Sequence, residues 1–217
     1  ILPIASGVIG STIAVQDAKS EQFLLSQSAL VAVEHIARAF GRRKRAIHDG
    51  GPSDSAFQSA LGQCGEILAF CSSRLDGTFA RGSIYDLLST SALCAATLIH
   101  GQGPSSLPLL PDLVKPLVDS LTKTNTLVTR NLDHEQKGHC AVAQVSLLRA
   151  LTALIETVPQ FMPQYLPSLL TDKVLLSEAI RDPHLVADPV QAAVERFDAV
   201  LATSVAARLL LPTVSAA

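Results

Sequence analysis

Aromatic and charged residues are both scarce in this sequence. It has no tryptophan, only two tyrosines and an aromatic content of 4%, and charged residues make up only 17% of the 217 positions. Hydrophobic residues make up 48%, so the chain is not of the disordered class, which is poor in apolar residues and rich in charge. The apolar residues are mostly Leu, Ala, Val and Ile, which favours helices packed on helices over an aromatic-rich β-sandwich.

Long apolar runs and a strong net charge are also missing. No segment reaches 18 uninterrupted apolar residues, which predicts that the chain does not span a membrane. The opening run over residues 1–15 is apolar, but it is short and lacks the basic stretch that begins a signal peptide. The formal net charge is −2, so a broad nucleic-acid-binding face is not expected. Because the chain begins at Ile1 and ends within an apolar pattern, we expect it to be a segment of a longer protein.

The four cysteines are expected to be free thiols rather than a disulfide framework. Cys64, Cys71, Cys94 and Cys140 all fall inside apolar helical patterns rather than at loop positions. This placement favours buried free thiols in a reducing compartment. Cys64 and Cys71 are seven residues apart, so on a helix they lie two turns apart and do not bridge to each other.

Helical periodicity is the strongest positive signal. One stripe of apolar side chains advances in steps of four and three residues, the spacing of an amphipathic helix; it comprises Phe57, Leu61, Cys64, Leu68, Cys71 and Leu75. Similar stripes occur near residues 25–40, 84–98, 145–158 and 190–205. No segment alternates at a period of two over the length of a strand. The sequence therefore predicts an all-α protein.

The apolar stripes recur along the chain, as expected of a repeat protein. The tripeptide Ser-Ala-Leu stands at residues 28–30, 59–61 and 91–93. Leu-Pro or Met-Pro also opens several apolar runs, and proline is tolerated in the first turn of a helix. These signals predict a HEAT- or armadillo-like α-solenoid of antiparallel helix pairs, in a single domain over residues 1–217.

The predicted repeats are about 50 residues long, slightly longer than the roughly 40–47 residues usual for HEAT units. They cover residues 1–41, 54–100, 108–158 and 162–206, with the start of a fifth at 208–217. Within them we expect helix pairs at 1–15 with 21–41, 54–75 with 83–100, 108–122 with 139–158, and 162–171 with 189–206. The polar segments at 41–53, 123–138 and 172–188 are interpreted as linkers.

Few residues suggest chemistry. His134, His139 and Cys140 lie within seven residues of one another, but a structural zinc site needs four ligands, and no second pair stands at a matching spacing. We interpret these residues as part of a solvated linker that runs into a helix. The G-x-S-x-G turn, the phosphate-binding loop and the G-x-G-x-x-G fingerprint are all absent from the sequence. The sequence thus predicts no catalytic, metal-binding or cofactor-binding residue, and no enzyme.

A basic run is the surface feature that stands out: Arg42, Arg43, Lys44 and Arg45. It follows the predicted end of a helix, where positive charge interacts favourably with the helix dipole. One interpretation is a solvated loop that stabilises the helix end. The other is a contact with phosphate or with an acidic partner, or a nuclear import signal. Four positive charges would supply a few contacts to an RNA backbone but no sequence readout.

Two strings resemble a known family. They are Leu154-Ile-Glu-Thr-Val-Pro-Gln-Phe-Met-Pro-Gln-Tyr-Leu-Pro-Ser-Leu-Leu170 and Val200-Leu-Ala-Thr-Ser-Val-Ala-Ala-Arg-Leu-Leu-Leu-Pro212. Both resemble the C-terminal region of the U-three-snoRNA-associated protein ten family, the large nucleolar HEAT-repeat proteins of the small-subunit processome. The resemblance is best over residues 105–217 and weaker over 20–104. Residues 41–53 and 123–138 match nothing in the family pattern.

The resemblance implies a structural scaffold for early small-subunit pre-rRNA processing and assembly, located in the nucleolus. It implies contacts with other processome subunits and, for this segment, only weak contact with pre-rRNA or snoRNA. It implies no cofactor, membrane or small-molecule substrate. An alternative is a peptide-binding transport or adaptor solenoid, importin-like or phosphatase-scaffold-like. Such a protein would carry a ladder of Asn or acidic residues at matching repeat positions, and the sequence has no such ladder.

Overall fold

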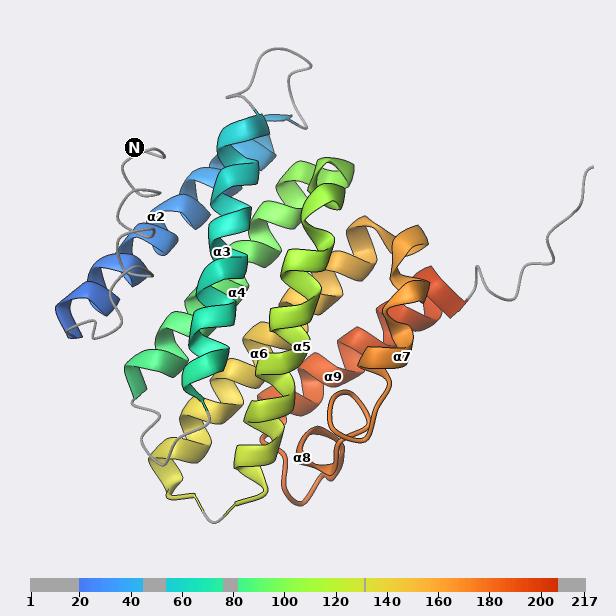
Figure 1. Cartoon of the computed structure of the whole chain (residues 1–217). Coiled ribbons are helices and arrows are strands. Elements are labelled where there is room, and N and C mark those ends of the chain that lie inside the picture. Colours follow the sequence, from blue (N-terminus) through green and yellow to red (C-terminus); the bar gives the residue numbers. More distant parts are fainter. Residues whose placement is uncertain (1–19, 45–53, 76–81, 131, 207–217) are drawn as a thin grey trace, which may run out of the picture.

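Helices make up most of the chain (Figure 1). The computed structural model describes residues 20–44, 54–75, 82–130 and 132–206. The longer helices are α2 (Ser20–Lys44), α3 (Asp54–Arg74), α4 (Gly82–Gln102), α5 (Leu110–Val128), α6 (His134–Thr157) and α9 (Asp188–Leu201). The short elements are η1 (Gly103–Leu109), η2 (Pro159–Gln164), α7 (Leu166–Leu169), α8 (Glu178–Arg181) and η3 (Ala202–Ala206). No strand occurs within these ranges, in agreement with the all-α prediction.

The helices form two layers (Figure 1). In one layer α2 packs on α4, α4 on α6 and α6 on α9. In the other layer α3 packs on α5, and α5 contacts α8. The layers are joined by helices that are consecutive in sequence, α3 with α4 and α5 with α6. This stacking of successive helix pairs confirms the prediction of an α-solenoid, in which each pair buries its apolar face on its neighbours. The assignment of the whole chain to one domain stays a prediction.

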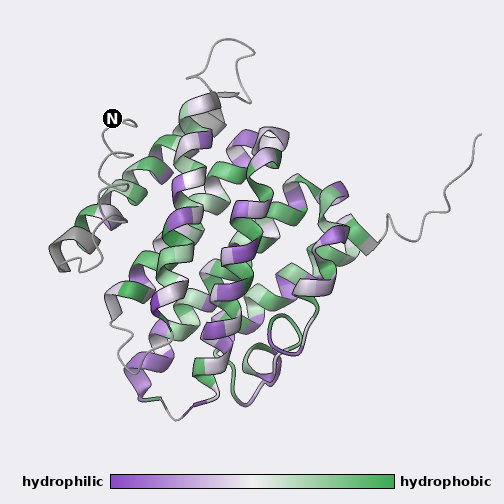
Figure 2. Ribbon diagram, viewed as in Figure 1, coloured by the Kyte–Doolittle hydropathy of each residue, from purple (hydrophilic) through white to green (hydrophobic). Residues whose placement is uncertain are grey.

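The apolar stripe predicted at residues 57–75 lies in the core. Its members Leu61, Cys64, Leu68, Cys71 and Leu75 are at most 1% exposed. Hydrophilic positions gather instead on the outward side of α3 and α5, which Figure 2 shows in purple. The buried stripe therefore joins α3 to the other layer and leaves the opposite side of the helix at the surface.

Small residues let α3 and α4 approach each other closely. The hydroxyl of Ser91, in the third Ser-Ala-Leu tripeptide, donates a hydrogen bond of 3.0 Å to the carbonyl oxygen of Cys64. Both residues are fully buried. Helix α4 then ends at Gln102, and Gly103 follows with a φ of +59°. Only glycine adopts this left-handed conformation at no steric cost, so Gly103 marks the exit from the helix.

The predicted linker at 123–138 is mostly helical, because α5 and α6 both extend into it and leave only residues 129–133 between them. Its polar side chains bond to the helices themselves. The hydroxyl of Thr124 donates to the carbonyl one turn earlier, at 2.8 Å. The carboxylate of Asp133 accepts a bond of 2.8 Å from the backbone N–H of Gln136, which caps α6 and sets its start.

The fourth repeat differs most from the prediction. The helix expected at 162–171 is replaced by the 3-10 turn η2 and the four-residue helix α7. Pro163 and Pro167 explain the interruption, since proline removes a backbone donor from a helix. The linker predicted at 172–188 contains α8 and packs against the rest of the stack. Its burial shows this, since four of its side chains are at most 3% exposed: Val174, Leu175, Ala179 and Ile180. The segments predicted at 1–15 and 208–217 lie outside the described residues.

Two stretches of the described chain are long and apolar enough, by length and composition alone, to cross a membrane. They are Gly82–Val128 and His134–Thr157, and 61% and 67% of their most apolar windows are buried against other parts of the protein. Helices in the interior of a helical stack have these same properties. The finding is therefore weak evidence for a membrane span.

Candidate interaction surfaces

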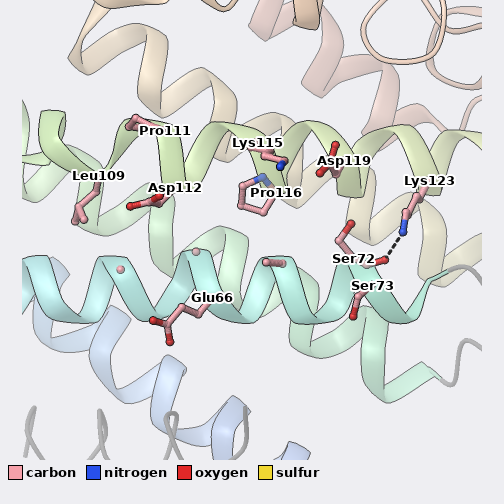
Figure 3. A pocket seen from close by; sticks show the side chains of 13 residues that line it. Glu66, Ser72, Ser73, Leu109, Pro111, Asp112, Lys115, Pro116, Asp119 and Lys123 are labelled. Atoms are coloured by element: carbon pink, nitrogen blue, oxygen red, sulfur yellow. Dashed lines mark hydrogen bonds between the residues drawn. The ribbon is translucent and has the colours of Figure 1, made fainter. Parts of the chain in front are cut away.

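A groove of about 750 Å³ lies between α3 and α5 on the outward side of their layer (Figure 3). Small residues of α3 line it, among them Gly62, Gly65 and Ala69, and Pro116 lines it from α5. A Cβ atom added at Gly62 would meet nothing within 4 Å. The groove exists because most of the α3 side chains that face it are small.

Both ends of the groove are marked by longer side chains of the α5 side (Figure 3). At one end Leu109 points toward α3, and at the other Lys123 reaches across to α3. The Lys123 ammonium donates a hydrogen bond of 2.9 Å to the carbonyl of Ser72, near the C-terminal end of α3. A lysine that bonds a carbonyl in the last turns of a helix also interacts favourably with the helix dipole.

The two helices touch near the Leu109 end of the groove. A Cβ atom added at Gly65 would lie 2.9 Å from the carbonyl oxygen of Asp112. That carbonyl cannot receive the usual bond within α5, because the residue one turn later is Pro116, which has no N–H. Gly65 and Pro116 together therefore bring the backbones of α3 and α5 into contact.

The rim of the groove carries mixed charge with an acidic excess. Glu66, Asp112 and Asp119 line it, together with Lys115 and the bonded Lys123. Sequence reasoning missed this groove, because it depends on the distance between two helices. The available signal was the pair of glycines, Gly62 and Gly65, three residues apart in α3.

The predicted basic run begins inside a helix. Because α2 continues to Lys44, residues 42–44 form its last turn, and the prediction that the run lies in a linker is wrong for these three positions. Arg45 lies outside the described residues, as do the side chains of Arg42, Arg43 and Lys44. The proposed contact with phosphate or an acidic partner stays a prediction.

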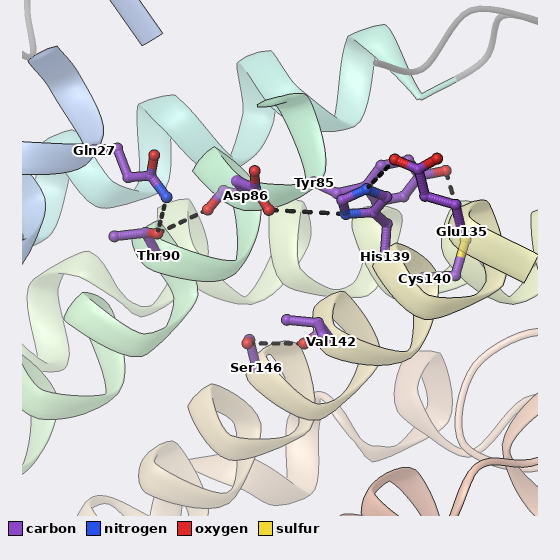
Figure 4. A network of polar contacts seen from close by, with 9 residues as sticks. All are labelled: Gln27, Tyr85, Asp86, Thr90, Glu135, His139, Cys140, Val142 and Ser146. Carbon is purple, nitrogen blue, oxygen red and sulfur yellow. Dashed lines mark hydrogen bonds and ion pairs between the residues drawn. The ribbon is translucent and has the colours of Figure 1, made fainter. Parts of the chain in front are cut away.

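His134, His139 and Cys140 lie in the first two turns of α6, not in a solvated linker. The His139 ring stacks on Tyr85 of α4, with 6.0 Å between ring centroids and 15° between planes, and the Cys140 sulfur lies 3.5 Å from the Tyr85 hydroxyl (Figure 4). His134 is exposed. Among the described residues no group of three or more His, Cys, Asp or Glu side chains fits a metal ion.

His139 instead forms a joint between α4 and α6 (Figure 4). Its Nδ1 lies 3.8 Å from Asp86 of α4, and its Nε2 lies 3.8 Å from Glu135 of α6. A Cβ atom added at Gly82 would lie 2.9 Å from the same Nε2, so the ring fits against bare backbone. Stacking and close packing thus fix one ring between two helices.

A second polar bridge joins the other end of the same layer. Glu156 of α6 lies 3.4 Å from the imidazole of His100 of α4 and 3.2 Å from the guanidinium of Arg196 of α9. The exposed Glu156–Arg196 ion pair contributes about 0–1 kcal/mol. The contacts of Glu156 join α6 to both α4 and α9.

The four cysteines are buried and free, as the sequence predicts. Burial raises the pKa of the Cys71 thiol to about 12. The pKa of the Cys94 thiol is also raised, mainly by its hydrogen bond with Cys64 and, to a smaller extent, by burial. Nucleophilic attack and metal binding require the thiolate. Thiols with raised pKa values suit the core-filling role and do not suit catalysis.

A polar cluster that the sequence did not reveal holds the segment after α7. The side-chain amide of Asn125 donates to the carbonyls of Lys173 and Val174, at 3.0 and 2.9 Å. Gln144 donates to the Asn125 oxygen at 3.0 Å and lies 3.4 Å from the carbonyl of Ala179. Asn125 and Gln144 are each 2% exposed. The two amides thus tie the segment to α5 and α6.

Two layers of stacked helix pairs define an α-solenoid protein. Comparison with known proteins agrees with the HEAT type. The chain is 28% identical over 138 residues, 62% of its length, to the HEAT repeat-containing protein 1 homolog of Dictyostelium discoideum. It is 28% identical over 129 residues, 59% of its length, to HEAT repeat-containing protein 1 of Homo sapiens.

The chain spans only 6% of the length of each of these relatives. No family model matches it, and no solved structure shows a significant match. The weak homology, together with the helical stack, supports a HEAT-repeat protein.

Proposed function

We propose that this chain is a structural scaffold segment of a ribosome-biogenesis factor that acts in early small-subunit pre-rRNA processing and assembly. The observation that carries the proposal is the pair of strings at 154–170 and 200–212, which resemble the nucleolar HEAT-repeat proteins of the small-subunit processome. The similarity to two HEAT repeat-containing protein 1 sequences is consistent with it. The proposed location is the nucleolus.

The role we propose is to present surfaces to other processome subunits. The helix stack supports such a role, because its polar side chains bridge neighbouring helices and its thiols are buried. Contact with RNA would be local and weak, because the net charge is −2 and the basic residues at 42–45 are few. No step of catalysis and no membrane or small-molecule ligand is part of the proposal.

The test is depletion of the protein in its native cells, followed by hybridisation analysis of pre-rRNA. We expect small-subunit precursors with an uncleaved 5′ leader to accumulate, while large-subunit precursors are processed normally. A tagged copy should locate to the nucleolus and sediment with large pre-ribosomal particles. Normal small-subunit processing after depletion would refute the proposal.

A further inference from the structure

We propose that the groove between α3 and α5 is the docking site of a basic amphipathic helix that belongs to a protein partner. The inference rests on the proposed scaffold function, because the partner is taken to be a protein of the same assembly. The shape and charge of the groove add to that proposal, because they indicate the chemistry of the partner.

The length of the groove suits a helix of about four turns. It extends along α5 from Leu109 to Lys123, a distance of about 21 Å at a rise of 1.5 Å per residue. Its volume of about 750 Å³ is open to solvent along the side away from the core. Glycine and alanine of α3 leave room for the side chains of an incoming helix rather than for its backbone alone.

An extended peptide is a poorer fit. Peptides that bind as strands take their affinity from a row of free backbone groups at a sheet edge. Both walls of this groove are helices, whose backbone groups bond within the helix. The carbonyl of Asp112, which Pro116 leaves without its usual donor, is covered by Gly65. Recognition therefore depends on side chains, as it does when an amphipathic helix lies in a groove.

The charges of the rim select a basic partner. Asp112 and Asp119 are both exposed and stand seven residues apart on α5, two turns of the helix. Glu66 lines the groove from α3, and Lys115 and Lys123 line it from α5, so three carboxylates stand against two lysines. Lys123 keeps its positive charge in its hydrogen bond to the Ser72 carbonyl, so the formal excess is one carboxylate. Lysine or arginine at positions i and i+7 of the partner would face the two aspartates, with small apolar residues between them entering the groove. The same acidic excess disfavours RNA, which is a polyanion.

The probe for the test is a fluorescent amphipathic peptide of about four turns, with Ala and Leu on one face and Lys at positions i and i+7. A second peptide carries Glu in place of Lys. Binding to the full chain is followed by fluorescence anisotropy at low and at physiological salt. We expect the basic peptide to bind and the acidic peptide not to bind, with an affinity that falls as salt rises.

Substitution of Gly62 tests whether the peptide binds in the groove. Gly62→Leu inserts a side chain where nothing lies within 4 Å, so it should fill the groove and leave the fold intact. We expect it to weaken binding of the basic peptide at least ten-fold, whereas Gly62→Ala should leave binding nearly unchanged. Gly101→Leu is the matched control on α4, because a Cβ atom there also meets nothing within 4 Å. Asp119→Lys should weaken binding and reduce its salt dependence.

Two results would overturn the inference. One is a basic peptide that binds no better than the acidic peptide, and the other is equal binding to the wild type and to a Gly62→Leu variant with a native circular dichroism spectrum. Either result leaves the depletion phenotype unaffected. Conversely, normal pre-rRNA processing after depletion refutes the proposed function and leaves the peptide measurements standing.

Discussion

Replacement of Gly65 by alanine tests how closely the backbones of α3 and α5 approach. Gly65 lies inside α3 at the contact with α5, and an added Cβ atom would lie 2.9 Å from the carbonyl oxygen of Asp112 and 3.5 Å from a methyl group of Leu113. The first contact is with backbone, so it is not relieved by rotation of a side chain. Either α3 or α5 must shift.

The magnitude follows from two opposing effects. Alanine is favoured over glycine inside a helix by roughly 0.5–1 kcal/mol. Overpacking of a tight interface costs about 1–3 kcal/mol. We therefore expect Gly65→Ala to lower the free energy of unfolding by about 1–2 kcal/mol. Gly62, three residues earlier in the same helix, has open space around its added Cβ, so Gly62→Ala should raise the free energy of unfolding by roughly 0.5–1 kcal/mol.

The assay is thermal and guanidinium denaturation of the two variants and the wild type, followed by circular dichroism in the far ultraviolet. A change of 1 kcal/mol moves the melting temperature of a chain of this size by about 2–4 °C. The two alanine variants should therefore melt on the order of 5–10 °C apart, with the wild type between them. If Gly65→Ala is as stable as Gly62→Ala, the helices do not approach as described and the reasoning is wrong.

Three further predictions concern other parts of the molecule. Asn125→Ala should destabilise the protein by roughly 1–3 kcal/mol and accelerate hydrogen exchange at residues 170–182, because buried carbonyls lose their donors; unchanged exchange there would contradict the assigned role. For Cys71, the pKa is raised from 9.0 to about 12, so its contribution to stability is present below pH 9 and is lost as the pH rises toward 12. Unfolding measured between pH 7 and 11 should accordingly depend less on pH in Cys71→Ala than in the wild type. Reversal of the three charges at residues 42–44 should lower stability by roughly 1 kcal/mol, since negative charge opposes the dipole at the end of α2, and an unaltered melting curve would show that this turn frays in solution.

Apolar periodicity predicts the interior helices well, because each of them buries a stripe against the other layer. The stripe at 57–75 and the stripe at 84–98 are the clearest examples, and they form the packed pair α3 and α4. Pro108 lies within the 3-10 turn η1, and α5 follows with Pro111 in its first turn, where proline is tolerated.

Polar content was the misleading signal. The sequence predicts linkers at residues 123–138 and 172–188 because of their polar side chains. In the structure, threonine hydroxyls bond to their own helix, and Asn125 is buried as a donor to another segment. Arg181 donates to the carbonyl of Leu175 at 2.7 Å and pairs with Asp198. A sequence pattern records the polarity of a side chain but not the partner that satisfies it.

The groove between α3 and α5 was beyond prediction for a different reason. It is bounded by residues of two repeats, and its dimensions depend on the contact between Gly65 and the Asp112 carbonyl. The sequence shows the glycines and the prolines separately. Only the fold shows that Gly65 faces the carbonyl that Pro116 leaves without a donor.

The grip of Asn125 and Gln144 on the segment after α7 has a consequence for how this protein can evolve. Both amides contact main-chain oxygens, which every amino acid supplies. The residues that supply these carbonyls can therefore be substituted as long as the backbone conformation of the segment is kept. Asn125 and Gln144 cannot be substituted in the same way, because their side chains make the contacts. Homologous chains in which residues 171–182 have changed should still carry Asn or Gln at both positions. The pair of amides could therefore identify this repeat in homologues whose overall sequence identity is too low to reveal it.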